Sequence, residues 1–305
     1  MTVLGIDTSN YTTSVACFDG ARGENCSRLL DVKPGELGLR QSDALFAHVR
    51  RLPELFAHLK ELCPDPFVAI GVSTRPREVE GSYMPCFLAG VSLAETLAAA
   101  LNVPLRRFSH QQGHIAAALW SAGRMDLMAR PHLAWHLSGG TTELLYVEPE
   151  GKSVRAEKLG GTTDISAGQL IDRAGKLLEL PFPAGKRLDE LSAGAERRDF
   201  FRVKEKDMLF SLSGAENKVR EYYEASGSPE ETAAYTLRTV IGAVLAATGS
   251  AQTRYPGLPV VFSGGVASNA MLRRACAGLD AVFAEPRFST DNAMGIAVLT
   301  WLQEQ

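Results

Sequence analysis

The chain has 305 residues, with 32 basic and 35 acidic side chains, and its net charge of −3 excludes an overall positive field that would attract nucleic acid. Any contact with nucleic acid must therefore use a local basic patch. The hydrophobic content of 45% and the aromatic content of 8% are typical of a globular protein, and the length allows two domains. The five cysteines are odd in number and widely spaced, which argues against a disulfide framework and against a zinc site of paired cysteines.

The N-terminal segment shows no targeting signal. It lacks a basic start, and its apolar stretch is too short for a signal peptide. Nothing in the sequence approaches a run of about eighteen apolar residues, so no membrane-spanning helix is expected. These features predict a cytoplasmic protein with no membrane partner.

The chain opens with a predicted β-hairpin. Residues 2–7 have the pattern of a buried strand, residues 8–12 that of a turn, and residues 13–18 that of a second strand. The small hydroxyl residues at the tip suit an anion or phosphate cradle. An ordinary hairpin at the start of a sheet explains the same residues, and the pattern alone favours this simpler interpretation.

Strands and helices then alternate, which predicts a layered α/β fold. The helix predicted at 42–62 has apolar side chains at helical spacing, and the helix predicted at 87–101 is rich in small residues that allow close packing. In chain order the expected elements are a loop at 25–40, a helix at 42–62, a strand at 68–72, a charged loop at 74–82, a helix at 87–101 and a strand at 103–107.

A pair of histidines at the start of the next helix is the first candidate for chemistry. Ser109 is a good N-cap, and the alanine-rich run that follows has high helix propensity. His110 and His114 therefore lie on one helical face, where two imidazoles can bind one metal ion. Two histidines near a helix start that are solvated or bonded to the backbone are the alternative. His132 and His136 have the same spacing within a strand pattern, so a core or surface role is favoured for them.

The opening pattern returns in the middle of the chain. A strand at 132–137 leads to a small-residue tip at 138–142 and to a second strand at 143–147. The repeat predicts two lobes of related build whose tips face a cleft. The expected division is an N-terminal lobe at 1–128 and a C-terminal lobe at 129–305, with the closing helix at 293–302 packing back on the first lobe.

The rest of the chain contains further candidate binding residues, namely three carboxylates and a glycine turn. Asp164 and Asp172 bracket the start of a predicted helix, and Asp172 suits a sugar hydroxyl or a magnesium-bound water. Solvated helix-cap carboxylates are the alternative. The turn at 263–269 carries two glycines between a strand and a helix, so backbone amides can approach a ligand there. Asp291 precedes the closing helix as an N-cap or a free carboxylate. Helices are expected at 169–179, 215–223, 229–248 and from the glycine turn through Cys276, and strands at 258–262 and 282–284.

Seven motifs in order resemble those of the TsaD-type tRNA threonylcarbamoyladenosine synthases, a family formerly described as glycoproteases of the M22 class. Each motif is weak alone, but their order along almost the whole chain is specific. They are Gly5-Ile-Asp-Thr-Ser9, His110-Gln-Gln-Gly-His114, Ser138-Gly-Gly-Thr-Thr142, the stretch from Asp164 through Gly168 to Asp172, Phe210-Ser-Leu-Ser-Gly214, Ser263-Gly-Gly-Val-Ala-Ser-Asn269 and Ser289-Thr-Asp-Asn292.

The resemblance implies a fold, a reaction and a set of site residues. The fold is the two-lobed actin-like (ASKHA, ribonuclease H-like) α/β architecture, with a mixed β-sheet and flanking helices in each lobe. The reaction is an acyl transfer that moves a threonylcarbamoyl group from threonylcarbamoyl-AMP to an adenosine of tRNA. The implied metal ligands, for Fe²⁺ or Zn²⁺, are His110, His114 and Asp291. The implied residues for the adenylate substrate, or for ATP or AMP, are Ser138, Gly139, Gly140, Thr141, Asp164, Gly168, Asp172, Gly264, Gly265 and Asn269.

This chain departs from the family pattern near the expected substrate. Thr141 replaces a usual histidine, Gln169 replaces an acidic residue, and the charged loop at 74–82 replaces a glycine–proline-rich loop. Two other functions therefore stay open: a related carbamoyltransferase with a small-molecule or protein acceptor, and a non-catalytic paralogue that binds nucleotide and regulates a partner. The expected partners are tRNA, a paralogous two-lobe subunit and an ATPase. No catalytic residue is expected beyond the metal site.

Overall fold

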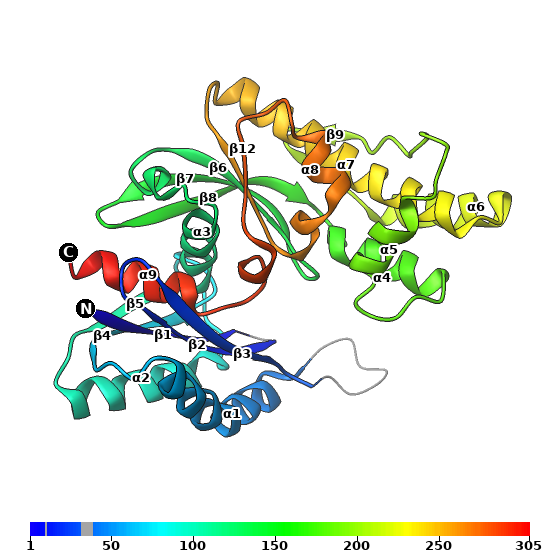
Figure 1. Cartoon of the computed structure of the whole chain (residues 1–305). Coiled ribbons are helices and arrows are strands. Elements are labelled where there is room, and N and C mark those ends of the chain that lie inside the picture. Colours follow the sequence, from blue (N-terminus) through cyan, green and yellow to red (C-terminus); the bar gives the residue numbers. More distant parts are fainter. Residues whose placement is uncertain (10, 32–38) are drawn as a thin grey trace. The chain divides into compact units, whose positions relative to one another are not determined.

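The computed structural model describes residues 1–9, 11–31 and 39–305 (Figure 1). Residues 32–38 of the loop expected at 25–40, including Lys33 and Gly35, lie outside the described residues. The described chain forms two compact units. Unit 1 contains residues 1–130, 148–156 and 291–305, and unit 2 contains residues 131–147 and 157–290. Over the described ranges, every helix is too short or too polar to cross a membrane.

Unit 1 is built on a five-stranded mixed sheet in the order β3-β2-β1-β4-β5. Its strands are β1 (Thr2–Ser9), β2 (Thr12–Phe18), β3 (Gly23–Leu29), β4 (Phe67–Arg75) and β5 (Leu105–Ser109). The expected opening hairpin is confirmed, because β1 and β2 pair antiparallel from Val3 and Phe18 to Ser9 and Thr12. β4 and β5 continue the sheet in parallel.

Strand β3 differs from the expectation of a loop beginning at residue 25. It pairs antiparallel with β2 along its length, and Cys26 is its one fully buried residue. An edge strand with so little buried surface carries almost no hydrophobic alternation, so pattern reasoning missed it.

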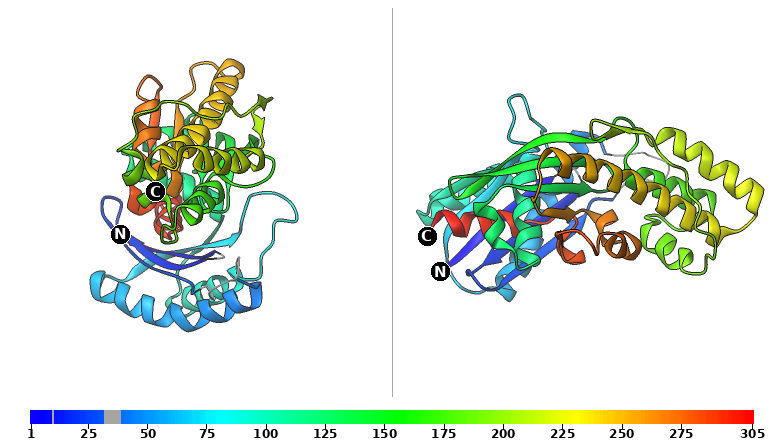
Figure 2. Two further views of the ribbon diagram at one scale, coloured as in Figure 1. Left: turned by 90° about the vertical axis from the view of Figure 1, so that its right-hand side faces the viewer. Right: turned by 90° about the horizontal axis from the view of Figure 1, so that it is seen from above.

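Helices cover both faces of this sheet (Figures 1 and 2). The helices of unit 1 are α1 (Gln41–Leu62), α2 (Phe87–Leu101), α3 (His110–Ser121) and α9 (Met294–Gln303). α1 and α2 pack on one face, and α9 packs on the other with α3 against it. The α3–α9 contact is very close, since a Cβ added to Gly295 would lie 1.8 Å from the carbonyl oxygen of Gly113. Glycine at both positions therefore brings the two helices together.

Unit 2 has a seven-stranded mixed sheet in the order β12-β11-β6-β7-β8-β10-β9. Its strands are β6 (His132–Leu137), β7 (Thr142–Glu150), β8 (Ser153–Thr162), β9 (Glu205–Lys206), β10 (Leu209–Phe210), β11 (Val260–Ser263) and β12 (Ala281–Phe283). The hairpin of β6 and β7 matches the predicted repeat. Two mixed sheets with flanking helices confirm the expected α/β class.

The helices of unit 2 surround a core centred on β6, β11 and α7. They are α4 (Ala167–Leu177), α5 (Gly185–Ser192), α6 (Ser213–Ser226), α7 (Pro229–Arg254) and α8 (Ala270–Ala275). Short 3-10 helices lie at Gly265–Ser268 and Pro286–Phe288 in unit 2 and at Met125–Ala129 in unit 1. Trp135 and Phe262 are fully buried in this core. The helix expected after the glycine turn is α8, with Asn269 as its N-cap and Cys276 as its C-cap. A 3-10 turn at Gly265–Ser268 precedes it, because Asn269 leaves helical geometry to cap α8.

Candidate metal centre and nucleotide turns

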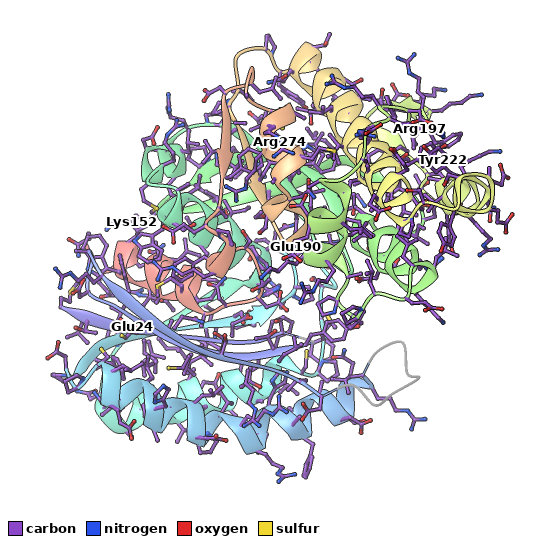
Figure 3. The ribbon with its side chains drawn as sticks, turned by 45° about the vertical axis from the view of Figure 1, so that its right-hand side comes forward. Glu24, Lys152, Glu190, Arg197, Tyr222 and Arg274 are labelled. Carbon is purple, nitrogen blue, oxygen red and sulfur yellow. The ribbon has the colours of Figure 1, made fainter. Side chains whose placement is uncertain are left out.

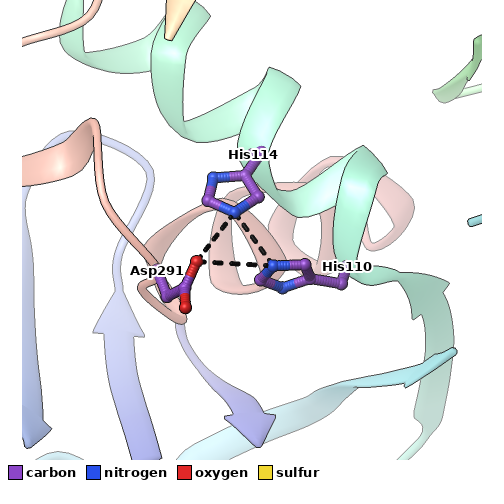
Figure 4. Close-up of side chains that lie close together, drawn as sticks. All are labelled: His110, His114 and Asp291. Carbon is purple, nitrogen blue, oxygen red and sulfur yellow. Dashed lines mark hydrogen bonds and ion pairs between the residues drawn. The ribbon is translucent and has the colours of Figure 1, made fainter. Parts of the chain in front are cut away.

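Helix α3 and the loop before α9, both in unit 1, bring three potential metal ligands together (Figure 4). The Nε2 atoms of His110 and His114 lie 2.9 Å apart. Oδ1 of Asp291 lies 3.2 Å from His114 Nε2 and 3.6 Å from His110 Nε2. The three donor atoms thus form one small triangle, although Asp291 is 177 residues beyond His114 in the chain.

These separations fit a single metal ion. With metal–ligand bonds of about 2.1 Å, the three distances correspond to angles of about 87°, 99° and 118° at the metal. Such angles span the octahedral and tetrahedral values. Two imidazoles and one carboxylate with open positions suit Fe²⁺ or Zn²⁺.

Local sequence fixes the histidine helix. The Ser109 hydroxyl accepts the Gln112 N–H at 3.3 Å, and the Gln112 side chain accepts the Ser109 N–H at 2.8 Å, which forms a capping box. The Gln112 amide also donates to Ser153 and Val154 at the tip of the β7–β8 hairpin, within unit 1. The start of α3 is therefore stabilised both by its own capping box and by hydrogen bonds to the β7–β8 hairpin.

Asp7 is a buried carboxylate that the sequence analysis did not assign to the site. Its Oδ1 accepts a hydrogen bond from His110 Nδ1 at 3.1 Å and another from the Ser73 hydroxyl. A carboxylate on Nδ1 holds the ring in the tautomer whose Nε2 is free to bind a metal. The one sequence feature that could have marked Asp7 as a site residue is its position at the end of an apolar strand. No local pattern links residue 7 to residue 110.

The two carboxylates control the protonation of His110. Burial lowers the pKa of His110, but the charge of Asp7 and the hydrogen bond to Asp291 outweigh burial and raise the pKa to about 10. Burial raises the pKa of Asp291, while the hydrogen bonds from His110 and His114 hold it well below its usual range. Because a ligand nitrogen must lose its proton to bind a metal, binding of a metal by these residues would release protons.

The first candidate nucleotide turn of unit 2, residues 138–142, is compact and has open space above its glycines. The Ser138 hydroxyl accepts the Thr141 N–H at 3.0 Å, and the Thr141 carbonyl accepts the Ser138 N–H at 2.8 Å. A Cβ at Gly139 or Gly140 would meet nothing within 4 Å. A Cβ at Gly168 would lie 2.5 Å from the Ser138 carbonyl oxygen, so only glycine lets the start of α4 approach this turn.

The second turn lies beside the first. β11 pairs in parallel with β6, so the carboxyl ends of both strands meet at one sheet edge. Gly264 has a φ of 93°, and its Cβ would lie 2.1 Å from the Leu137 carbonyl oxygen, directly before Ser138. Gly265 has no atom within 4 Å of a built Cβ. Gly264 is therefore required by the fold, whereas Gly265 is open to a ligand.

The side chains of Asp164, Asp172 and Asn269, which were expected to bind substrate, instead bind groups of other protein segments. The Asp164 carboxylate accepts the Leu212 N–H at 2.8 Å and the Ser211 hydroxyl, which fixes the start of α6. Although burial raises the pKa of Asp164, these bonds hold it well below its usual range. Asp172 accepts the Ala184 N–H at 2.8 Å, and burial raises its pKa.

Asn269 caps α8 and meets a residue that sequence reasoning missed. Its Oδ1 accepts the Leu272 N–H at 2.9 Å, and its Nδ2 donates to Asp189 at 2.8 Å. The other oxygen of Asp189 accepts the Ala270 N–H at 3.0 Å. Asp189 thus joins α5 to the second nucleotide turn, and its place within a charged, solvent-facing stretch gave no sign of this contact.

A small apolar cavity lies beneath the turns in unit 2. Its volume is about 10 Å³. Such a volume holds at most one water molecule, so a nucleobase would have to bind outside it. The lining residues are Leu137, Ile171, Leu237, Val240, Ile241, Val244, Val266, Asn269 and Leu272.

The charged stretch between α5 and β9 faces solvent, where Arg197 bonds to Tyr222 of α6 (Figure 3).

Solved structures with known folds match most of this chain. A hexokinase of the ROK family from Thermus thermophilus aligns over 100% of this chain and 99% of its own, with 15% identity and a TM-score of 0.54. Full-length HypF in the phosphate- and nucleotide-bound form aligns over 98% of this chain and 55% of its own, with 14% identity and a TM-score of 0.60. The fold is therefore the actin-like fold of sugar kinases and their relatives.

Sequence comparison assigns the family. The model of the TsaD family, tRNA N6-adenosine threonylcarbamoyltransferase, matches residues 44–298. A tRNA N6-adenosine threonylcarbamoyltransferase from Anaeromyxobacter sp. (strain Fw109-5) is 31% identical over 98% of this chain and 93% of its own length. The chain therefore belongs to the TsaD family.

Proposed function

We propose that this protein transfers a threonylcarbamoyl group from threonylcarbamoyl-AMP to an adenosine of tRNA. Family membership over residues 44–298 supports the reaction class. The observation that carries the proposal is the triangle of His110, His114 and Asp291, whose donor atoms all lie within 4.8 Å of one another. A protein that only regulates a partner has no evident need for such a ligand set.

The three ligands would hold one divalent ion, Fe²⁺ or Zn²⁺. When bound, such an ion acts as a Lewis acid on carbamoyl or phosphate oxygens. Asp7 orients His110 through Nδ1, and Gln112 fixes the helix turn between the two histidines. These residues keep the ligand geometry constant while substrate enters and product leaves.

The turns of unit 2 would bind the adenylate. Backbone N–H groups at a glycine turn attract phosphate or a developing oxyanion, and the space above Gly139, Gly140 and Gly265 leaves room for one. Gly168 and Gly264 place these turns next to each other. Asp164, Asp172 and Asn269 support the turns and the adjoining helices through the hydrogen bonds described above.

The partners follow from the substrates. The adenylate must come from an enzyme that activates threonine and carbonate with ATP, and tRNA must dock on a chain whose net charge is −3. A paralogous two-lobe subunit and an ATPase are the further partners that we propose.

A carbamoyltransferase with a small-molecule or protein acceptor is the second candidate, and the loop at 74–82 favours it. The Pro76 carbonyl accepts the Gln111 N–H at 3.0 Å, so this loop adjoins the histidine helix. Its two arginines are balanced by two glutamates, and Arg75 pairs with Glu78. A loop without net positive charge is a weak site for a tRNA backbone. A non-catalytic paralogue is the third candidate.

The deciding experiment uses cells in which this protein is the only family member. Mass spectrometry of tRNA nucleosides should show loss of threonylcarbamoyladenosine when the gene is deleted. The wild-type gene should restore the modified nucleoside, and a gene carrying His110→Ala and His114→Ala should not. Normal levels of the modified nucleoside after deletion would contradict the proposal and favour another acceptor.

A further inference from the structure

Two buried oxygen atoms near the metal centre have no hydrogen-bond partner among the described residues. They are Oδ2 of Asp7, whose residue is 0% exposed, and Oγ of Ser9, whose residue is 4% exposed. Leaving a buried polar atom unpaired costs about 1–3 kcal/mol, and more for a charged group. Buried polar atoms in native proteins are nearly always satisfied, so a bound group is the natural partner for both.

The side chains of Asp7 and Ser9 lie on the face of the unit 1 sheet next to which Asp291 is placed. Side chains two apart on a strand share a face, so Asp7 and Ser9 point to the same side of β1. Ser9 pairs with Thr12 across the hairpin, and the Thr12 hydroxyl donates to Oδ2 of Asp291 at 3.5 Å. All these groups belong to unit 1.

Thr8 marks the opposite face of the same strand. Its hydroxyl donates to the Cys86 carbonyl at 3.1 Å, on the side covered by α2. The unpaired oxygens of its two neighbours are therefore directed away from α2 and toward the metal-ligand side.

The donor atoms here differ in kind from those of the histidine site. The histidine site offers two nitrogens and one carboxylate oxygen, which suit Fe²⁺ or Zn²⁺. Asp7 Oδ2, Ser9 Oγ, Thr12 Oγ1 and Asp291 Oδ2 are all oxygens, and a hard divalent cation prefers such ligands. Asp291 faces both sets, because Oδ1 lies near the histidines and Oδ2 lies near Thr12.

We propose that Asp7 Oδ2 and Ser9 Oγ bind a second divalent cation of the Mg²⁺ type, next to the histidine site and on the Oδ2 side of Asp291. Mg²⁺ commonly takes one or two protein oxygens and keeps several waters or phosphate oxygens. The second cation would satisfy both unpaired atoms and compensate the charge of the neighbouring Asp7 and Asp291 carboxylates. The proposal does not depend on the acceptor of the transferred group.

The test uses Mn²⁺ as a paramagnetic probe on the full chain loaded with one Zn²⁺. Electron paramagnetic resonance of free Mn²⁺ measures binding, and elemental analysis measures retained Zn²⁺. We expect one Mn²⁺ per chain without loss of Zn²⁺. Ser9→Ala should weaken Mn²⁺ binding at least about tenfold, which corresponds to about 1.4 kcal/mol.

Matched variants separate this site from its surroundings. Thr8→Val removes a hydroxyl from the other face of β1 and should leave Mn²⁺ affinity unchanged. Ser9→Thr keeps the hydroxyl and should retain binding, which also provides a test if Ser9→Ala does not fold. The double variant His110→Ala and His114→Ala should lose Zn²⁺ but still bind Mn²⁺.

Three results would overturn the proposal. The Zn²⁺-loaded protein could bind no Mn²⁺, in which case the two oxygens share only a water molecule. Mn²⁺ could bind only as Zn²⁺ is released, so that a single site exists. Ser9→Ala could bind Mn²⁺ as tightly as the wild type. If Ser9→Ala does not fold, loss of Mn²⁺ binding in Ser9→Thr would overturn the proposal instead.

Discussion

His110 lies between the carboxylates of Asp7 and Asp291, and each of its ring nitrogens has a separate role. Nδ1 bonds to Asp7 at 3.1 Å, while Nε2 faces His114 and Asp291. One carboxylate thus orients the ring and the other completes the ligand set. In the proposed histidine site, Asp7 would act on the metal only through His110, which makes it a positioning residue for that site.

The first prediction concerns the metal content. Purified protein should contain about one equivalent of Fe²⁺ or Zn²⁺ by elemental analysis, because three donors at these separations fit one ion. The double variant His110→Ala and His114→Ala should contain almost none. His58→Gln, which changes an exposed histidine of α1, is the control and should keep the metal. Equal metal content in the double variant would exclude this site.

The second prediction concerns His48, which is fully buried on α1 and bonded to Thr13 at 2.8 Å. Burial lowers its pKa to about 4, against an opposing effect of Asp7. Below about pH 6.5 the unfolded chain binds a proton that the folded chain does not, so stability falls as the pH drops from about 6.5 to 4. The loss should be about 2–3 kcal/mol.

Urea unfolding at pH 7 and pH 5 measures this loss. The His48→Gln variant cannot gain the proton, so its stability should change less over the same interval. An identical pH dependence in the variant and the wild type would show that other groups cause the loss.

At the scale of elements, two neighbouring glycines of the turn at 263–269 have different roles. The backbone requires glycine at position 264, whereas position 265 is open to a ligand. Gly264 has positive φ and no room for a Cβ, whereas Gly265 has open space. Gly264→Ala should therefore lower the free energy of unfolding by about 1–3 kcal/mol or more. Gly265→Val should fold normally but bind AMP or an acyl-adenylate severely less tightly, since a side chain would occupy the ligand's space.

Thermal unfolding and calorimetric titration with AMP check the two turn variants. A folded Gly265→Val protein with unchanged AMP affinity would remove this turn from the nucleotide site.

The loop at 74–82 is the other element with a testable role. Arg75 lies opposite Ser109 in the sheet register, next to the start of the histidine helix. The Arg75–Glu78 pair is partly exposed and should contribute less than about 1 kcal/mol to stability. If an arginine of this loop holds an anionic part of the acceptor, lysine should replace it poorly, because it lacks the planar fork.

We therefore expect Arg75→Lys or Arg77→Lys to lower turnover at an unchanged melting temperature. Steady-state kinetics and thermal unfolding of the two variants measure both effects. Unaltered kinetics in both would leave the loop as a surface connection.

Local sequence predicted the elements that have strong local signals. Helix α3 could be predicted from its Ser109 cap and its alanine-rich run, and helix α1 from the helical spacing of its apolar residues. β8 was not predicted, because its sequence alternates charges with few apolar residues. Asp7 and Asp189 were missed for a different reason: their contacts join residues that are 103 and 80 positions apart, which no local pattern reports.

At the scale of the whole molecule, charge limits how tRNA can bind. With a net charge of −3, the isolated chain should neutralise few phosphates. A protein with six to ten phosphate contacts loses about 10³–10⁵ in affinity between 50 and 200 mM salt. We expect a loss below about 10³ for this chain, measured by fluorescence anisotropy with labelled tRNA. A steeper dependence would reveal a concentrated basic surface.

The division of the chain into units has a consequence for biosynthesis. The chain passes between the units at four places, and the last passage, after Thr290, returns it to unit 1 with Asp291 and α9. During translation both histidines emerge long before this carboxylate exists. A nascent chain that stops short of Asp291 thus has two ligands, no third ligand and no α9 to hold α3, so it cannot form the centre. With the proposed ligands, only chains that have been synthesised past Asp291 could therefore acquire the metal, and the order of residues along the polypeptide would set the time at which it can enter.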